Sequence, residues 1–228
     1  MKLIKFVPSL SDREKMLLEP VPTKSHVPEW YRLGEHEFTD SDGNVQHGMK
    51  TCAPFLDGML AGYSLLTPFD IFVGRNEDGS HNVRWNGPEE WSGFIGERDK
   101  GLGATIPRPA GHSPNGLVWS SKWGWKTPKG WSTLVTHPLN RFDLPFTTLS
   151  GIIDSDKMMV NGNLPFFLKS DFVGVIPAGT PYAQILPIKR RFWKKVADFG
   201  LISSLIQQGN AVKDKPYKKY LWQKKSYN

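Results

Sequence analysis

The sequence has little of what secreted and membrane proteins depend on. It holds a single cysteine, Cys52, among 228 residues. No disulfide can therefore form within the chain, and we expect a reducing compartment. No stretch approaches the roughly 18 apolar residues of a membrane-spanning helix, and the opening residues lack the apolar core of a signal peptide. We expect a protein that is made in a cytoplasm and does not associate with a membrane.

Signature motifs of common catalytic sites are also missing. The sequence contains neither a Gly-x-Ser-x-Gly nucleophile motif nor a phosphate-binding P-loop. Its six histidines lack the close spacing of zinc proteases, and one cysteine excludes the usual structural zinc sets. The best distributed potential ligands are His137, Asp143 and Asp154. The sequence thus specifies no cofactor and leaves open only a divalent metal held by His137 with these carboxylates.

Positive charge is concentrated at one end of the chain. Residues 189–228 contain eleven Lys and Arg against two Asp, a net of +9, whereas the other 188 residues hold 18 basic and 20 acidic residues, a net of −2. The final segment, 213–228, interleaves lysines with aromatic residues. Such a tail can bind nucleic acid through phosphate attraction and stacking, pack on an acidic neighbour, or remain solvated; the sequence leaves these alternatives open.

Short strands separated by turns account for most of the pattern. Eighteen prolines and 22 glycines indicate short elements. Asp42-Gly43 and Asp78-Gly79 each predict a β-hairpin. Residues 145–188 alternate short apolar segments with turn residues. Helical spacing appears only after Arg190, where apolar residues from 193 to 206 fall on one face.

The predicted fold is mostly β, a single β-clip or jelly-roll-like barrel core with a C-terminal α-helix. Strands and helices do not alternate along the sequence, which argues against a doubly wound or TIM-type fold. We divide the chain into an N-terminal arm and hairpin (1–50), a β core domain (51–190), and a C-terminal helix with a basic tail (191–228).

Tryptophans concentrate between residues 117 and 138. The pattern there predicts two strands joined by Thr-Pro-Lys-Gly, forming a hairpin whose aromatic face carries Trp119, either Trp123 or Trp125, and Trp131. This face is either a surface on which bases or sugars stack, or part of the core and of a subunit interface. The second use is expected of any hairpin, because one face of a sheet needs large residues.

The segment "LSGIIDSD" (149–156) ends an apolar strand in two aspartates. Asp and Ser often close such a strand by bonding to their own backbone two residues on. A carboxylate at a strand end also serves to orient a water molecule or to bind a metal. Asp154 is therefore either part of a turn or a catalytic group.

Three segments, taken in order, resemble motifs of the dUTPase family. "AGYSL" (61–65) is similar to the first motif, "GIIDSD" (151–156) to the third, and "IPAGTPYAQILPI" (176–188) to a glycine turn followed by an Ala-Gln strand. The resemblance implies a β-clip core with the catalytic water at the third motif.

The same resemblance implies roles for two residues: Asp154 orients the hydrolytic water, and Gln184 lies nearby and assists. A hydrolase built on this core would use Arg141 with Lys157 to contact phosphates. The sequence also departs from the family. Lys157 stands where the third motif has its sugar-packing Tyr, Ser64 stands where the first motif has Asp, and the Arg-Ser-Gly phosphate motif and the glycine-rich C-terminal arm have no counterparts.

A broader resemblance, over roughly residues 50–193, is to an uncharacterised family from tailed phages of marine bacteria and from some bacteria. It is based on segments such as "GWSTLVTHPLNR" (130–141) and "VIPAGTPYAQILPIKRRFW" (175–193). This resemblance implies a phage origin, and with it a location in the host cytoplasm or in the phage particle.

Three functional hypotheses follow. The first is a phage-type, β-rich structural or binding protein without catalysis, forming a homo-oligomer and contacting other components of a phage assembly. The second is a dUTPase-like nucleotide hydrolase that uses Asp154. The third is a metal-dependent small-molecule enzyme in a cupin-like barrel, with His137 and a carboxylate as metal ligands.

Overall fold

A computed structural model of the chain describes residues 2–8, 18–97, 107–159, 162–198, 204, 206–207 and 221–227. Most elements in these ranges are short strands, as the frequent prolines and glycines predict. The strands are β1 (Lys5–Pro8), β2 (Val21–Pro22), β3 (Glu37–Thr39), β4 (Val45–His47), β5 (Tyr63–Leu66), β6 (Ile71–Arg75), β7 (His81–Trp85), β8 (Ile95–Glu97), β9 (Leu117–Ser120), β10 (Trp123–Lys126), β11 (Trp131–Thr136), β12 (Phe146–Thr148), β13 (Gly151–Ile153), β14 (Asn163–Leu168), β15 (Gly174–Ile176) and β16 (Pro181–Lys189). The helices are α1 (Glu29–Leu33) and α2 (Ala53–Leu60), with 3₁₀ turns at Thr23–His26, Met49–Thr51 and Glu89–Trp91.

The described strands pair antiparallel into five sheets. The largest has the order β13-β11-β16-β5-β2, the next has the order β12-β14-β9-β8, and a third has the order β15-β6-β7. Two further pairs are β1-β10 and β3-β4. The mostly β class is therefore confirmed, but the strands described do not close into the single barrel that we expected. Because β1 and β2 pair with β10 and β5, parts of the N-terminal fifty residues belong to the same sheets as the core.

One hydrophobic core joins the three larger sheets. Trp119 on β9 is wholly buried and stacks on Phe166 of β14, with ring centroids 3.8 Å apart and planes at 12°. Ile71 from β6 and Ile185 from β16 enter the same cluster. This shared core explains why so short a set of strands holds together, since each sheet alone buries only one face.

The structure corrects the prediction of a tryptophan hairpin with a stacking surface. Trp119 and Trp125 are both 0% exposed, so they cannot form a stacking surface, and only Trp131 is partly accessible. Their indole N–H groups donate to Thr148 Oγ1 (3.2 Å) and Thr133 Oγ1 (2.9 Å), which satisfies them inside the core. The first predicted strand is divided into β9 and β10 and the second is β11; all three pair with other strands and not with one another.

The helix predicted after Arg190 is not found where the structure describes it. Residues 191–198 have no regular secondary structure, and only Ser204, Ile206 and Gln207 have helical backbone; most of the remaining predicted helix lies outside the described residues. We call residues 191–196, Arg-Phe-Trp-Lys-Lys-Val, the arm. Phe192 is 108% exposed, Trp193 is 88% exposed and Val196 is 78% exposed. An amphipathic pattern forms a helix only when its apolar face has a surface to cover, and the described chain offers the arm none.

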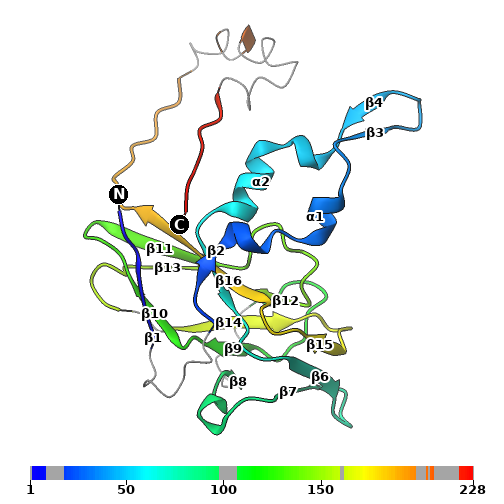
Figure 1. Ribbon diagram of the computed structural model, residues 1–228, viewed down its shortest axis with the longest axis vertical. Helices are drawn as coiled ribbons and strands as arrows, with labels where there is room; N and C mark the ends of the chain where they lie inside the picture. The colour runs from blue at the N-terminus through cyan, green and yellow to red at the C-terminus, as the bar shows by residue number, and fades with distance from the viewer. Residues whose placement is uncertain are drawn as a thin grey trace.

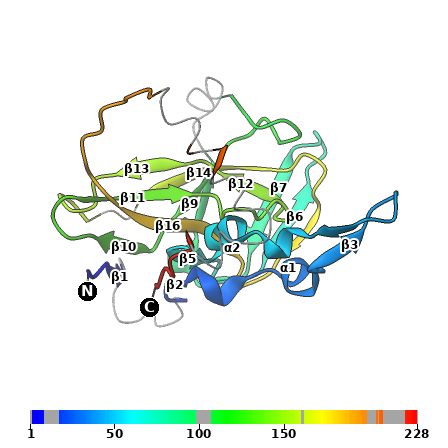
Figure 2. The same ribbon diagram turned by 90° about the horizontal axis from the view of Figure 1, so that it is seen from above.

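Two segments project from the body on different sides. The β3–β4 hairpin extends from the edge of the molecule that carries α1, and the arm leaves the body beyond the end of β16 at the other side (Figure 1). The view from above shows the same separation (Figure 2). In neither view does the arm approach the hairpin.

The last described segment, 221–227, returns to the body. Trp222 Nε1 donates to Asp57 Oδ2 at 2.9 Å, and Lys225 Nζ pairs with the same oxygen at 2.6 Å. The ring of Tyr227 packs edge-on against Tyr63 at 6.2 Å. This part of the basic tail therefore docks on α2 and β5 of its own chain. No helix among the described residues has the length and apolar content to cross a membrane.

Candidate functional site

The aspartates of "LSGIIDSD" lie in a polar cluster built around Arg190. Asp154 follows β13, which pairs with β11, so its Oδ1 accepts from Ser132 Oγ at 2.7 Å. Arg190, directly after β16, donates to Asp154 Oδ1 at 3.2 Å and to Asp156 Oδ1 at 2.8 Å, and its second terminal nitrogen contacts Asp156 Oδ2. The backbone N–H of Gly130 donates to Asp156 Oδ2 at 2.8 Å. Three separate segments are thus joined through these carboxylates.

The charges of this cluster hold both carboxyls ionised. Hydrogen bonds from Arg190 and from the Gly130 N–H bring the pKa of Asp156 far below its usual value. A hydrogen bond from Ser132, followed by the charge of Arg190, lowers the pKa of Asp154. The exposed side chain of Lys157 places its Nζ 3.9 Å from Asp154 Oδ2. A carboxylate that is a weaker base and is already paired is poorly suited to take a proton from water.

The structure does not bring Asp154 and Gln184 together. Along β11, Ser132 lies beside Asp154, whereas Thr136 pairs with Gln184. Ser132 and Thr136 are four residue steps apart along the strand, a distance of about 13 Å. The two residues that the dUTPase resemblance implies for catalysis therefore lie beside opposite ends of β11.

Gln184 has its own bonding partners, and all belong to the fold. It is 0% exposed. Its Oε1 accepts from the Leu139 N–H at 2.8 Å, and its Nε2 donates to the carbonyls of Gly58 (3.0 Å) and Ala61 (2.5 Å). The last carbonyls of an α-helix have no partner within the helix, and Gly58 and Ala61 stand at the end of α2. Gln184 thus caps α2 and ties it to the loop before Arg141.

Gly62 of "AGYSL" and its neighbour Ser64 also have structural roles. Gly62 has φ +69°, and a Cβ there would overlap the carbonyl oxygen of Ile185; only glycine permits this approach. Ser64 is buried and donates to Thr23 Oγ1 at 3.1 Å. Ser64, Gln184 and Arg141 do converge, but around a space of about 10 Å³, which holds no more than about one water molecule.

His137, the predicted metal ligand, uses both ring nitrogens within the fold. Its Nδ1 accepts from the Thr148 N–H at 3.3 Å, so its Nε2 must carry the proton that it donates to the Arg141 carbonyl at 3.0 Å. Burial lowers the pKa of His137, which keeps the ring neutral. Among the described residues no group of three His, Cys, Asp or Glu side chains is arranged to hold a metal.

Arg141 and Asp143 form an ion pair at the edge of a cleft. The guanidinium binds the carboxylate with two nitrogens, at 2.9 Å each, and the Asp143 carboxyl has a lowered pKa because this pairing outweighs the effect of burial. Arg141 also donates to the His26 carbonyl at 3.4 Å. Arg141 is therefore fixed in direction, with Asp143 neutralising its charge locally.

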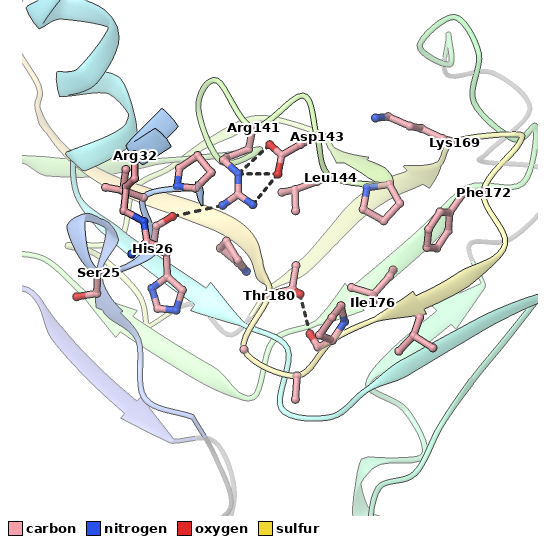
Figure 3. A pocket seen from close by; sticks show the side chains of 18 of the residues that line it. Ser25, His26, Arg32, Arg141, Asp143, Leu144, Lys169, Phe172, Ile176 and Thr180 are labelled. Atoms are coloured by element: carbon pink, nitrogen blue, oxygen red, sulfur yellow. Dashed lines mark hydrogen bonds and ion pairs between the residues drawn. The ribbon is translucent and has the colours of Figure 1, made fainter. Parts of the chain in front are cut away.

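The cleft itself has a volume of about 730 Å³. It lies between the 3₁₀ turn at Thr23–His26, the loop around Arg141, and the open edge of β15 (Figure 3). Arg32 and Lys169 line it on opposite sides, and in the described part of the chain neither forms an ion pair with a carboxylate. Phe172 adds an aromatic wall. The chemistry of this cleft suits an anionic group attached to an apolar body.

His26 is a further polar group in this wall. Its Nδ1 is buried and has no hydrogen-bond partner among the described residues. Burial, followed by the charge of Arg141, lowers the pKa of the ring. His26 is thus a neutral histidine whose Nδ1 is buried in the cleft wall.

The chain matches no protein-family model, and no curated protein matches it significantly. The dUTPase and phage-family resemblances accordingly stay predictions, and function has to be argued from geometry.

Several residues of these sites were not predicted from the sequence. Arg190 was interpreted as the start of a helix, although two aspartates without a basic partner could have indicated a distant cation. Arg32 and Lys169 gave no signal, because an isolated basic residue is common on any surface. The spacing of Trp193 and Val196 predicts a buried helix face, whereas both side chains are exposed in the structure.

Proposed function

We propose that this chain is a phage-type, β-rich structural or binding protein that works as a homo-oligomer and not as an enzyme. The observation that carries the proposal is the exposure of the arm. Phe192, Trp193 and Val196 lie on one short irregular segment with 78% or more of each side chain accessible. Contiguous exposed apolar surface of this kind marks a contact with another molecule.

The hydrogen bonds of Arg190, the residue directly before the arm, support this function. The Arg190 N–H donates to the Gly130 carbonyl at 2.9 Å, and its guanidinium is held by Asp154 and Asp156. The segment is therefore fixed up to the residue where the arm begins. Fixing this point lowers the entropy lost when the arm meets a partner, and it gives the "IDSD" turn a role without catalysis.

The states of the candidate catalytic groups support the same proposal. Gln184 and His137 have their polar atoms engaged inside the fold, and Asp154 is paired with Arg190. A hydrolase would need at least one of these groups to be free to contact a substrate or a water molecule.

Size-exclusion chromatography with light-scattering detection, which gives the mass of the eluting protein, tests the proposal. Wild type at micromolar concentration is expected to have a mass that is a multiple of the 25.8 kDa chain. Phe192→Ser/Trp193→Ser is expected to have the mass of one chain, with its circular dichroism unchanged. The matched control is Phe142→Ser/Ile152→Ser, which removes side chains that are 77% and 68% exposed elsewhere; it should keep the wild-type mass. A monomeric wild type would contradict the proposal.

A second candidate function is the binding of a phosphorylated ligand such as a nucleotide, and the cleft favours it. Arg32 and Lys169 face the cleft without carboxylate partners in the described chain. Calorimetric titration with a nucleoside triphosphate should show binding that Lys169→Met weakens at least tenfold. Lys157→Met is the matched control, because Lys157 adjoins Asp154 outside this cleft. If Lys157→Met weakens binding and Lys169→Met does not, the phosphate site lies beside Asp154 and not in this cleft.

A further inference from the structure

The β3–β4 hairpin is a second exposed segment that lacks cover. Residues 35–47, which we call the acidic hairpin, contain strands that pair only with each other, and every residue of both strands is exposed. Phe38 is 50% exposed and Val45 is 67% exposed. A two-stranded sheet with both faces in water is marginal by itself, so a hairpin of this kind gains stability from a partner.

The turn of this hairpin is nevertheless preorganised. Asp40 Oδ1 accepts from the N–H groups of Asp42 (3.0 Å) and Asn44 (2.9 Å), and its Oδ2 accepts from Gln46 Nε2 at 2.9 Å. Gly43 has φ +83°, which the tight turn requires. These bonds hold the shape of the tip while leaving its outer surface open.

The arm and the acidic hairpin are complementary in charge and alike in apolar content. The hairpin contains four acidic residues (Glu35, Glu37, Asp40 and Asp42) and no Lys or Arg. The arm contains three basic residues (Arg191, Lys194 and Lys195) and no acidic residue. Each segment also exposes large apolar side chains. Opposite charge around an apolar centre is the pattern of a specific interface.

The two segments do not meet within one chain. The hairpin and the arm project from different sides of the body in both views (Figures 1 and 2). Two copies of the arm would repel each other, and so would two copies of the hairpin, because each carries charge of one sign. The complementary contact is therefore available only between the arm of one copy and the hairpin of another.

We propose that copies of this chain assemble head to tail, with the arm of one copy bound to the acidic hairpin of the next. This inference rests on the proposed oligomeric function and specifies its interface. Both outer edges of the hairpin are unpaired among the described strands, so an extended arm can add along an edge as a further strand. Phe192 and Trp193 then cover the apolar side chains of the hairpin, while the flanking lysines face its carboxylates.

A head-to-tail contact has a structural consequence. It joins two different surfaces, so an open assembly keeps a free arm at one end and a free hairpin at the other until a ring closes. If no ring closes, the assembly grows as an open chain. An arrangement of this kind is common to rings and tubes, and it differs from a two-fold dimer, which is complete at two copies.

Mixing two assembly-defective variants tests the contact. The first is the arm variant, Phe192→Ser/Trp193→Ser, which keeps its hairpin. The second is the hairpin variant, Phe38→Ser/Asp42→Lys, which keeps its arm. Each alone is expected to be a single chain in light scattering. An equimolar mixture is expected to form a species of twice 25.8 kDa and nothing larger, because the one functional arm meets the one functional hairpin.

The control is the other predicted hairpin, formed by β6 and β7. Phe72→Ser/Glu77→Lys makes the same two kinds of change there, at a side chain that is 42% exposed and beside the Asp78-Gly79 turn. This variant is expected to assemble as wild type does. At a salt concentration of about 1 M the Debye length is about 3 Å, so the charges of the arm and the hairpin are screened from each other. Wild type is expected to dissociate under this condition.

The outcomes separate this inference from the proposed function. If wild type assembles and the hairpin variant assembles equally well, the head-to-tail contact is wrong and oligomeric function stands. A dimer of the hairpin variant alone would show that arms pair with each other, which also overturns the contact. If the mixture stays monomeric, the two segments do not bind. A monomeric wild type removes both proposals. Where the double variant fails to fold, Asp42→Lys alone replaces it. This single change keeps the turn, because Asp40 Oδ1 accepts from the backbone N–H groups of Asp42 and Asn44 and not from the Asp42 side chain.

Discussion

The clearest test of whether the dUTPase-like residues are structural or catalytic is the replacement Gln184→Leu. Leucine has a similar volume and keeps the strand, but it removes three hydrogen bonds at once. The Leu139 N–H then loses its acceptor, and the carbonyls of Gly58 and Ala61 lose their donor. All three groups face a side chain that is 0% exposed, so bulk water does not replace glutamine without opening the structure.

The expected loss follows from these three groups. A buried donor left without a partner costs about 1–3 kcal/mol, and a carbonyl that loses one of its bonds costs about 1 kcal/mol. The sum is about 4 kcal/mol in the free energy of unfolding. For a chain of this size, each kcal/mol lowers the melting temperature by about 2–4 °C. Gln184→Leu should therefore melt about 8–16 °C below wild type.

Two further variants make the measurement specific. Gln184→Glu keeps the acceptor for the Leu139 N–H but turns the donor toward Gly58 and Ala61 into an oxygen, so a comparable loss is expected from repulsion with two carbonyls. Gln223→Leu, at an exposed position of the docked tail, should change stability by less than about 0.5 kcal/mol. Urea unfolding followed by far-UV circular dichroism gives the free energies.

The reasoning would be refuted by a variant that folds as well as wild type. If Gln184→Leu lies within about 1 kcal/mol of wild type, the hydrogen bonds do not hold α2 in place. If the variant is also unable to hydrolyse a nucleoside triphosphate that wild type hydrolyses, Gln184 is catalytic, and the proposed function is wrong.

Three other predictions follow from single contacts. Because Arg190 depresses the pKa of Asp156 below its unfolded value of 3.8, the carboxylate stabilises the fold above about pH 4 and this contribution fades as the pH falls further; the melting temperature of Asp156→Asn should be lowest relative to wild type near pH 7 and converge with it toward pH 2. Trp119→Ala removes a wholly buried ring and should cost about 3–5 kcal/mol in urea unfolding. Trp222→Phe loses the bond to Asp57, worth about 1 kcal/mol, and should make the C-terminal segment more sensitive to limited proteolysis.

Features set by local chemistry could be predicted from the sequence. Both Asp-Gly pairs lie in hairpin turns, β3–β4 and β6–β7, because a short loop with a glycine at positive φ determines pairing over a few residues. The strands between 145 and 188 are present as β12 to β16. The polarity pattern also placed large apolar residues in a core, although it left the role of Trp119 and Trp125 undecided.

Features that depend on distant contacts could not be predicted. Helix α2 has only eight residues, contains Gly58 and has no side-chain hydrogen bond at its N-cap, Cys52, which makes it a poor helix by local propensity. It ends in carbonyls bound by Gln184, a residue more than 120 positions away. The strand partner of β10 is β1, near the start of the chain, and nothing in the sequence between 123 and 136 indicates this. Long-range pairing of this kind leaves no local pattern to read.

The candidate site shows the same limit in a sharper form. The segment "GIIDSD" has the same local sequence whether its aspartates activate water or bind a cation, since both uses need a carboxylate at a strand end. What separates the two is the residue opposite. Here that residue is Arg190, which pairs with both Asp154 and Asp156 and directly precedes the exposed aromatics of the arm. Under the proposed function, the strand end that would hold a substrate in a hydrolase instead fixes the residue at which the arm begins, so the resemblance of this segment to a dUTPase motif is compatible with an assembly role.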